Sequence, residues 1–173
     1  MNNLKLFPKA VIGIGVLFVV AGLLAAGAGI YIRSFTISQL EAQNITTPSD
    51  ASIPDTPVNS IATALSMANI IQHHAEGIGG GLTYAQMGRF AVEDGNPAGT
   101  SNPEEALLDA NGNPVANSAR NTQLTAAGLV TSLSLSAMAI GVAYGIIGVG
   151  AGFSVLGVVI AGFGYALLGL VIP

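Results

Sequence analysis

The chain has 173 residues and no cysteine, and only 8% of its residues are charged. The missing cysteine excludes disulfides, thiolate nucleophiles and zinc sites built on sulfur. The five basic residues are scattered and are outnumbered by nine acidic ones. This balance argues against nucleic acid as a partner, because neutralising phosphates needs clustered Lys or Arg.

The first predicted element is a transmembrane helix over residues 10–32. This stretch has 23 residues without a charge, and a bilayer core needs about 20 apolar helical residues. It is longer than the apolar core of an ordinary signal peptide, so we expect an uncleaved anchor. No helix breaker follows until Thr47-Pro48, and the helix is therefore expected to extend to about residue 43.

The charges predict the topology. Lys5 and Lys9 precede the first apolar stretch, whereas all the acidic residues lie in the central region, residues 34–123. Positive residues favour the cytoplasmic side, so residues 1–9 are expected inside and the acidic region outside the plasma (inner) membrane. Arg33 weakens this prediction, because it lies on the outer flank of the first helix.

The central region begins with a Pro-rich loop, residues 46–57, which we expect to be irregular. A helix should follow, with Thr56 as its N-cap, Pro57 as its first residue and Gly77 at its end. Apolar residues at helical spacing between these positions support it.

The rest of the central region is expected to contain little regular structure. The glycines at 79–81 predict a flexible joint, and Thr83 with Gln86 has capping-box spacing that should begin a short helix toward Phe90. Residues 93–117 are rich in turn-forming Asn, Asp, Gly and Pro, so we expect an irregular loop with one helical turn after Asn102.

The apolar C-terminal segment, residues 124–173, allows two interpretations. As one helix it would be about 75 Å long, far more than a bilayer needs. As a hairpin it would break at the glycines of residues 148–152, although its turn would then carry no charge. The predicted fold is therefore an all-α membrane protein with two, alternatively three, transmembrane helices and a mostly helical or irregular extracytoplasmic region.

Glycines in the two apolar segments form the clearest interaction pattern. Several are spaced so that helix backbones could approach closely, as small residues three or four apart do in membrane helices. The positions predicted to form a helix-packing interface are Gly13, Gly22, Gly141, Gly145, Gly148 and Gly152.

The stretch Ile70–Arg89 contains Ile-Ile, two His, a run of glycines, Thr-Tyr-Ala and an Arg. It resembles a signature of small actinobacterial membrane proteins, and the resemblance continues in Thr131-Ser-Leu and in residues 139–143. The resemblance implies a two-span envelope protein with an external loop and no established function, a group in which some members carry a ring-opening-dioxygenase label. This chain differs in its longer loop after Phe90 and its longer apolar C-terminus.

A dioxygenase iron centre would need two His and a carboxylate on one face. His73 and His74 are adjacent, so on a helix their side chains diverge by about 100°. His73 and Glu76 could supply two ligands of a metal, but the chain has no third His. These three residues are the only metal candidates, and we expect no catalytic residue and no cofactor.

These observations predict a non-enzymatic accessory or structural subunit of a larger membrane complex. Its Gly-rich helices would pack on other integral membrane subunits and on lipid, while its acidic loop would cover a partner's external face. The alternative is a membrane protein that binds a lipid or another hydrophobic ligand between its Gly-rich helices.

Overall fold

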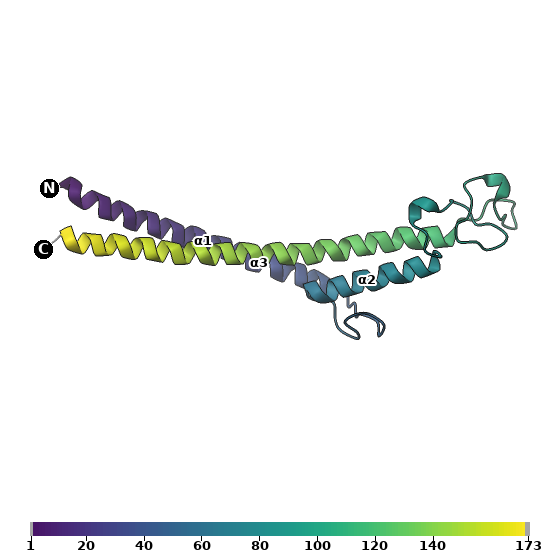
Figure 1. The fold of residues 1–173 in the computed structure, drawn as a ribbon, viewed down its shortest axis with the longest axis horizontal. Coiled ribbons are helices and arrows are strands. Elements are labelled where there is room, and N and C mark those ends of the chain that lie inside the picture. The colour runs from purple at the N-terminus through teal and green to yellow at the C-terminus, as the bar shows by residue number, and fades with distance from the viewer. Residues whose placement is uncertain (1, 172–173) are drawn as a thin grey trace. The chain divides into compact units, whose positions relative to one another are not determined.

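The computed structural model describes residues 2–171, with side chains from residue 6 to residue 170. Within this range the fold is all-helical. It has three α-helices, α1 (Asn2–Ala42), α2 (Ile61–Ile78) and α3 (Ser118–Val171), and two single-turn 3-10 helices, η1 (Tyr84–Gln86) and η2 (Pro103–Glu105) (Figure 1). The predicted segments 1–9 and 124–173 include residues 1, 172 and 173, which lie outside the described residues.

The chain forms two compact units, which are described separately. The helix-pair unit contains Met1–Gln39 and Met138–Pro173, and the loop unit contains Leu40–Ala137. The helix-pair unit is therefore the N-terminal part of α1 with the C-terminal part of α3, and the loop unit holds α2, η1, η2 and the start of α3.

Helix α1 runs for 41 residues and continues well beyond Ile32. It ends where the amide of Asn44 bonds the carbonyl of Glu41 and Asn44 turns to a φ of 50°. Asn tolerates this left-handed conformation better than most residues do, which suits it to the end of a helix. Together with α3, α1 is one of two helices that are long and apolar enough to cross a membrane.

Helix α3 is a single helix of 54 residues, so the hairpin interpretation of the C-terminal segment is wrong. The break at residues 148–152 that this alternative requires is absent because glycine lowers helix propensity by only about 1 kcal/mol, and no proline or polar turn residue is present there to stop the helix.

The boundaries predicted for α2 are wrong at both ends. Its N-cap is Ser60, because the hydroxyl of Ser60 accepts from the amide of Thr63 while the Thr63 hydroxyl accepts from the amide of Ser60, a reciprocal capping box. Thr56, the predicted N-cap, instead gives its amide to the hydroxyl of Thr47, and Pro57 pairs with Thr46 in an isolated bridge.

At its C-terminus α2 passes Gly77 and ends at Ile78, with Gly79 as the C-cap. Gly80 and Gly81 have φ values of 61° and 79°, and the amide of Gly81 bonds the carbonyl of Glu76 at 2.8 Å. The three glycines thus form a hydrogen-bonded helix terminus, and at Gly80 and Gly81 the backbone has a conformation that only glycine adopts readily.

The remaining loop is held by backbone hydrogen bonds and by those of one buried polar side chain, Asn117. Phe90 forms isolated bridges to Thr100 and Ala116, while η1 is a single turn that stops at Gln86, short of the predicted end near Phe90. Asn117 is buried and uses its whole amide: the nitrogen donates to the carbonyls of Gly88 and Pro97, and the oxygen accepts from the first amides of α3. This side chain therefore caps α3 and ties the loop to it.

Candidate functional site: a glycine interface and a polar groove

In the helix-pair unit α1 and α3 run antiparallel, with the two chain termini at the same end (Figure 1). Every seventh residue on the facing sides is small and buried. On α1 these positions are Gly15, Gly22 and Gly29; on α3 they are Ala143, Gly150, Gly157 and Gly164. Seven residues are close to two helical turns, so each set lies along one face of its helix.

The two backbones are in direct contact at these glycines. A Cβ added to Gly157 would lie 2.5 Å from the carbonyl oxygen of Gly15 and 2.6 Å from the amide nitrogen of Val19. The same addition at Gly150 would lie 2.5 Å from the amide nitrogen of Ala26. Only residues without a Cβ permit this approach, which brings van der Waals contacts that larger side chains would prevent.

Most of the glycines predicted as an interface do not contact the opposite helix of this pair. Gly22 packs against α3, but a Cβ on Gly13, Gly145, Gly148 or Gly152 would meet no atom within 4 Å, and Gly141 is exposed. On α3 the four glycines predicted as an interface are all exposed and are spaced by four, three and four residues, so they lie on one face. Because Gly148 precedes the buried Gly150 by two residues, or about 200° of helical rotation, this face points away from α1.

The structure does not bring the three metal candidates together. Nε2 of His74 lies 2.7 Å from a carboxylate oxygen of Asp50, and Glu76 accepts a hydrogen bond from Gln72. The rings of His73 and His74 are tilted, with centroids 6.3 Å apart. Among the described residues no group of three or more His, Asp or Glu could hold a metal ion.

The pairing of His74 with Asp50 joins the loop after α1 to α2. Both side chains are about half exposed. The hydrogen bond from His74 lowers the pKa of Asp50 below its ordinary value, more than the slight burial of the carboxyl raises it. In an exposed position this bond orients the loop and contributes little to stability.

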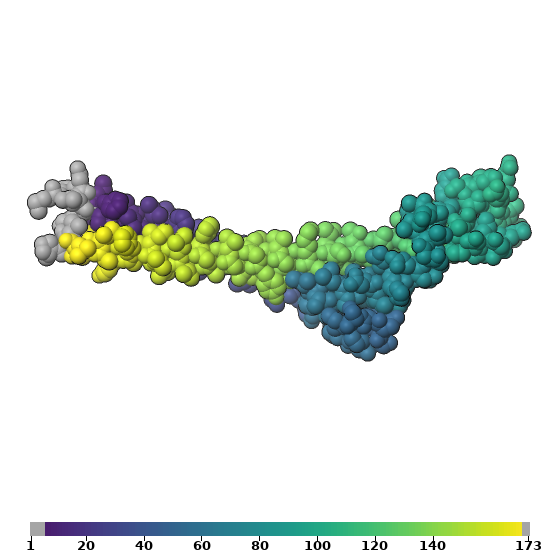
Figure 2. Space-filling view, in the orientation of Figure 1, coloured from purple at the N-terminus to yellow at the C-terminus, as the bar shows by residue number. Residues whose placement is uncertain are grey.

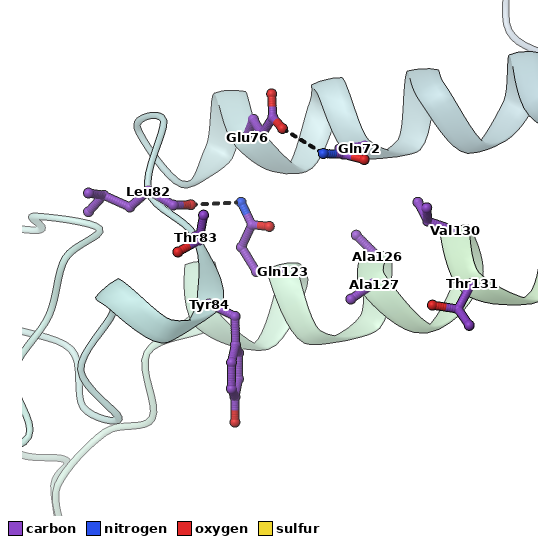
Figure 3. Close-up of a pocket in the computed structure, with 10 residues that line it drawn as sticks. All are labelled: Gln72, Glu76, Leu82, Thr83, Tyr84, Gln123, Ala126, Ala127, Val130 and Thr131. Carbon is purple, nitrogen blue, oxygen red and sulfur yellow. Dashed lines mark hydrogen bonds between the residues drawn. The ribbon is translucent and has the colours of Figure 1, made fainter. Parts of the chain in front are cut away.

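The loop unit also contains a groove of about 310 Å³ between α2 and the first turns of α3 (Figure 3). Ala126, Ala127 and Val130 of α3 line one side of it, and Gln72 and Glu76 of α2 line the other. The segment Leu82–Tyr84 and the side chain of Gln123 close one end.

Gln123 holds this end of the groove in place. Its amide nitrogen donates to the carbonyl of Ala75 at 2.9 Å and to that of Leu82 at 3.1 Å. It therefore ties α3 both to the last turns of α2 and to the segment after it. Beside it, the guanidinium of Arg120 stacks on the ring of Tyr84, 3.9 Å from the ring centroid.

Of the glycines that pack the helix pair, only Gly22 was among those predicted from the sequence, and the groove was not predicted at all. The seven-residue spacing of the others is a signal in the sequence, but the prediction rested on spacings of three and four residues. The groove has no signal in the sequence, because its polar residues come from segments about 50 residues apart, Gln72 and Gln123.

Comparisons with protein-family models, with curated proteins and with solved structures found no match to this chain. The resemblance of residues 70–89 to small actinobacterial membrane proteins therefore stays a prediction.

Proposed function

We propose that this chain is a non-enzymatic, membrane-anchored subunit of a larger membrane complex. The observation that carries the proposal is the second glycine face of α3, formed by Gly141, Gly145, Gly148 and Gly152. This face points away from α1, and Figure 2 shows the C-terminal part of α3 uncovered on the side in view. Small residues at this spacing let a further helix approach closely within lipid, and a helix of another subunit would fit it.

Exposed tyrosines support a position in the membrane. Tyr31 and Tyr144 lie near the same level of the helix pair, since Nε of Arg33 donates to the hydroxyl of Tyr144 at 2.9 Å. Tyr165 is 74% exposed near the other end. The helix between Tyr144 and Tyr165 is about 32 Å long, close to the thickness of a bilayer core. Tyrosines favour the two membrane interfaces, so these residues would mark the boundaries.

The proposed orientation places Lys9 and the chain termini in the cytoplasm and the loop unit outside. The loop unit contains all nine acidic residues of the chain but only two basic ones, Arg89 and Arg120. An acidic surface of this kind would meet a basic external face of the partner, since complementary charge guides and orients association.

The alternative, a lipid or hydrophobic ligand held between the Gly-rich helices, has no support in the packing of α1 on α3. Their backbones touch at Gly15, Gly22, Gly150 and Gly157, which leaves no space for a ligand between them. A lipid would have to bind the outer faces, as it does on any membrane helix.

The test is purification of the tagged chain in a mild detergent, with mass spectrometry of the proteins that co-elute. Gly148→Leu should reduce the yield of co-eluting subunits, because its side chain would fill the space needed by a neighbouring helix. Ala151→Leu is the control: this exposed residue is rotated by about 60° from Gly148 and by about 100° from Gly152, at the edge of the glycine face, so the substitution should reduce the yield less than Gly148→Leu does.

Circular dichroism should show the same helix content for both variants, because neither position contacts α1 in the helix pair. A wild-type chain that elutes alone as a stable monomer would overturn the proposal. Equal loss of partners in the two variants would remove the glycine face as its basis.

A further inference from the structure

The groove between α2 and α3 in the loop unit is lined by hydrogen-bond acceptors whose orientation the structure fixes. Both partners of the Gln123 amide nitrogen are backbone carbonyls, which only accept. The nitrogen must therefore be the atom that faces them, and Oε1 of Gln123 is turned into the space between the helices (Figure 3).

The same argument applies to the side chains opposite, on α2. Nε2 of Gln72 donates to Oε1 of Glu76 at 2.9 Å, and a carboxylate can only accept. This bond leaves Oε1 of Gln72 and the second carboxylate oxygen of Glu76 free to accept. Gln72 and Gln123 thus offer acceptor oxygens at the groove, and Glu76 lines it with a charged carboxylate whose second oxygen points away from α3 in Figure 3.

The other lining residues are apolar except for the hydroxyl-bearing Thr83, Tyr84 and Thr131, and the groove extends along α3. Ala126, Ala127 and Val130 form its floor, with Leu82 at the closed end. Such a surface favours an aliphatic chain, because its burial removes apolar area from water. Arg120, the basic residue nearest in sequence to Gln123, stacks on Tyr84 and is not among the residues that line the groove.

We propose that this groove binds a primary ammonium group carried on an aliphatic stem. The ammonium has three donors and no acceptor, which matches a lining of acceptors, and its charge complements Glu76. The stem lies over the two alanines. The excess of carboxylates in the loop unit raises the local concentration of such a cation. This inference is independent of the proposed subunit role.

The probe is 1,6-diaminohexane, added to the full chain in a non-ionic detergent and followed by the chemical shifts of the groove residues in NMR. We expect saturable binding, and much weaker binding of 1,6-hexanediol, which has the same stem without the charge. Glu76→Gln should weaken binding of the diamine about fivefold, the size expected for one partly exposed charge-assisted contact.

Three further variants distinguish binding in the groove from a general effect of charge. Ala127→Leu fills the floor and should abolish binding, while Thr125→Leu, on another face of the same helix, should not. Glu104→Gln removes the same charge as Glu76→Gln but outside the groove, and it should leave the affinity unchanged. Equal binding of the diol, no saturable binding of the diamine, or equal effects of Glu76→Gln and Glu104→Gln would each overturn the proposal.

Discussion

Gly150→Ala tests whether backbone contact holds the helix pair together. The added methyl group would lie 2.5 Å from the amide nitrogen of Ala26 and 2.6 Å from the carbonyl oxygen of Gly22. Both are backbone atoms of α1, so no side-chain rotation can relieve the overlap. An ordinary contact begins at about 3.4 Å, and the helices must therefore separate by roughly 1 Å around this position.

The expected cost follows from two opposing terms. Forcing an extra methyl group into a close-packed contact costs about 1–3 kcal/mol, while replacing Gly by Ala within a helix returns up to about 1 kcal/mol. We expect a net loss of about 1–2 kcal/mol in the free energy of unfolding. A titration with a denaturing detergent, followed by energy transfer between dyes on α1 and α3, would measure it.

Gly148→Ala is the matched control, two residues away on the same helix. A Cβ there meets nothing within 4 Å, so only the gain in helix propensity remains. In the isolated chain this variant should be as stable as the wild type or slightly more stable. If Gly150→Ala and Gly148→Ala unfold at the same detergent concentration, the glycine contact does not hold the pair together.

Three further predictions concern the loop unit. Asn117→Asp keeps the cap on α3 but places a carboxylate against two backbone carbonyls, so the free energy of unfolding at neutral pH should fall by about 2–4 kcal/mol in thermal unfolding. Part of this loss should be regained in acid, because a protonated carboxyl can donate a hydrogen bond to a carbonyl. Ser60→Ala removes the α2 cap and should cost about 1 kcal/mol in the same assay, whereas an unchanged melting temperature would contradict the capping box. His74→Ala should raise the pKa of Asp50 toward its ordinary 3.8 in an NMR titration, while that of Asp109, lowered by the amides of its own turn, stays unchanged.

The pH dependence expected from Asp50 has a definite sign. Its pKa is lowered in the folded chain, so any stabilisation from the pair with His74 is present above the ordinary pKa of 3.8 and is lost as the pH falls through the lowered value. Because both groups are exposed, the effect should appear in the order of the loop at residues 46–57 more than in global unfolding.

The long helices could be predicted because their signal is local and repeated over many residues. An uninterrupted apolar run without proline allows little except a helix, and α1 and α3 follow from that. The choice between one long helix and a hairpin in the C-terminal segment could not be made in the same way. It depends on whether glycines at residues 148–152 stop a helix, and glycine alone does not.

Boundaries within the loop unit failed where two local signals competed. Thr56-Pro57 and Ser60 are both plausible starts for α2, and the sequence offers no way to rank them. In the structure Ser60 is the N-cap because Ser60 and Thr63 exchange hydrogen bonds between side-chain hydroxyl and backbone amide. Thr56 instead bonds Thr47, and Pro57 pairs with Thr46. Such a choice depends on contacts with residues nine and eleven positions away in the sequence, which the pattern of a single helix does not contain.

The small-residue spacing of membrane helices led to the prediction of glycines that mostly do not lie in the contact between α1 and α3. Spacings of three and four residues are typical of small-residue contacts between membrane helices, and they led to Gly145 and Gly148. The contact between α1 and α3 instead repeats every seven residues, and antiparallel packing pairs Gly15 with Gly157, Gly22 with Gly150 and Gly29 with Ala143. As one partner moves seven residues along α1, the other moves seven back along α3, so both repeats stay in register. The pair therefore leaves the glycines spaced by three and four with no role inside this unit, and a neighbouring helix is the role we propose for them.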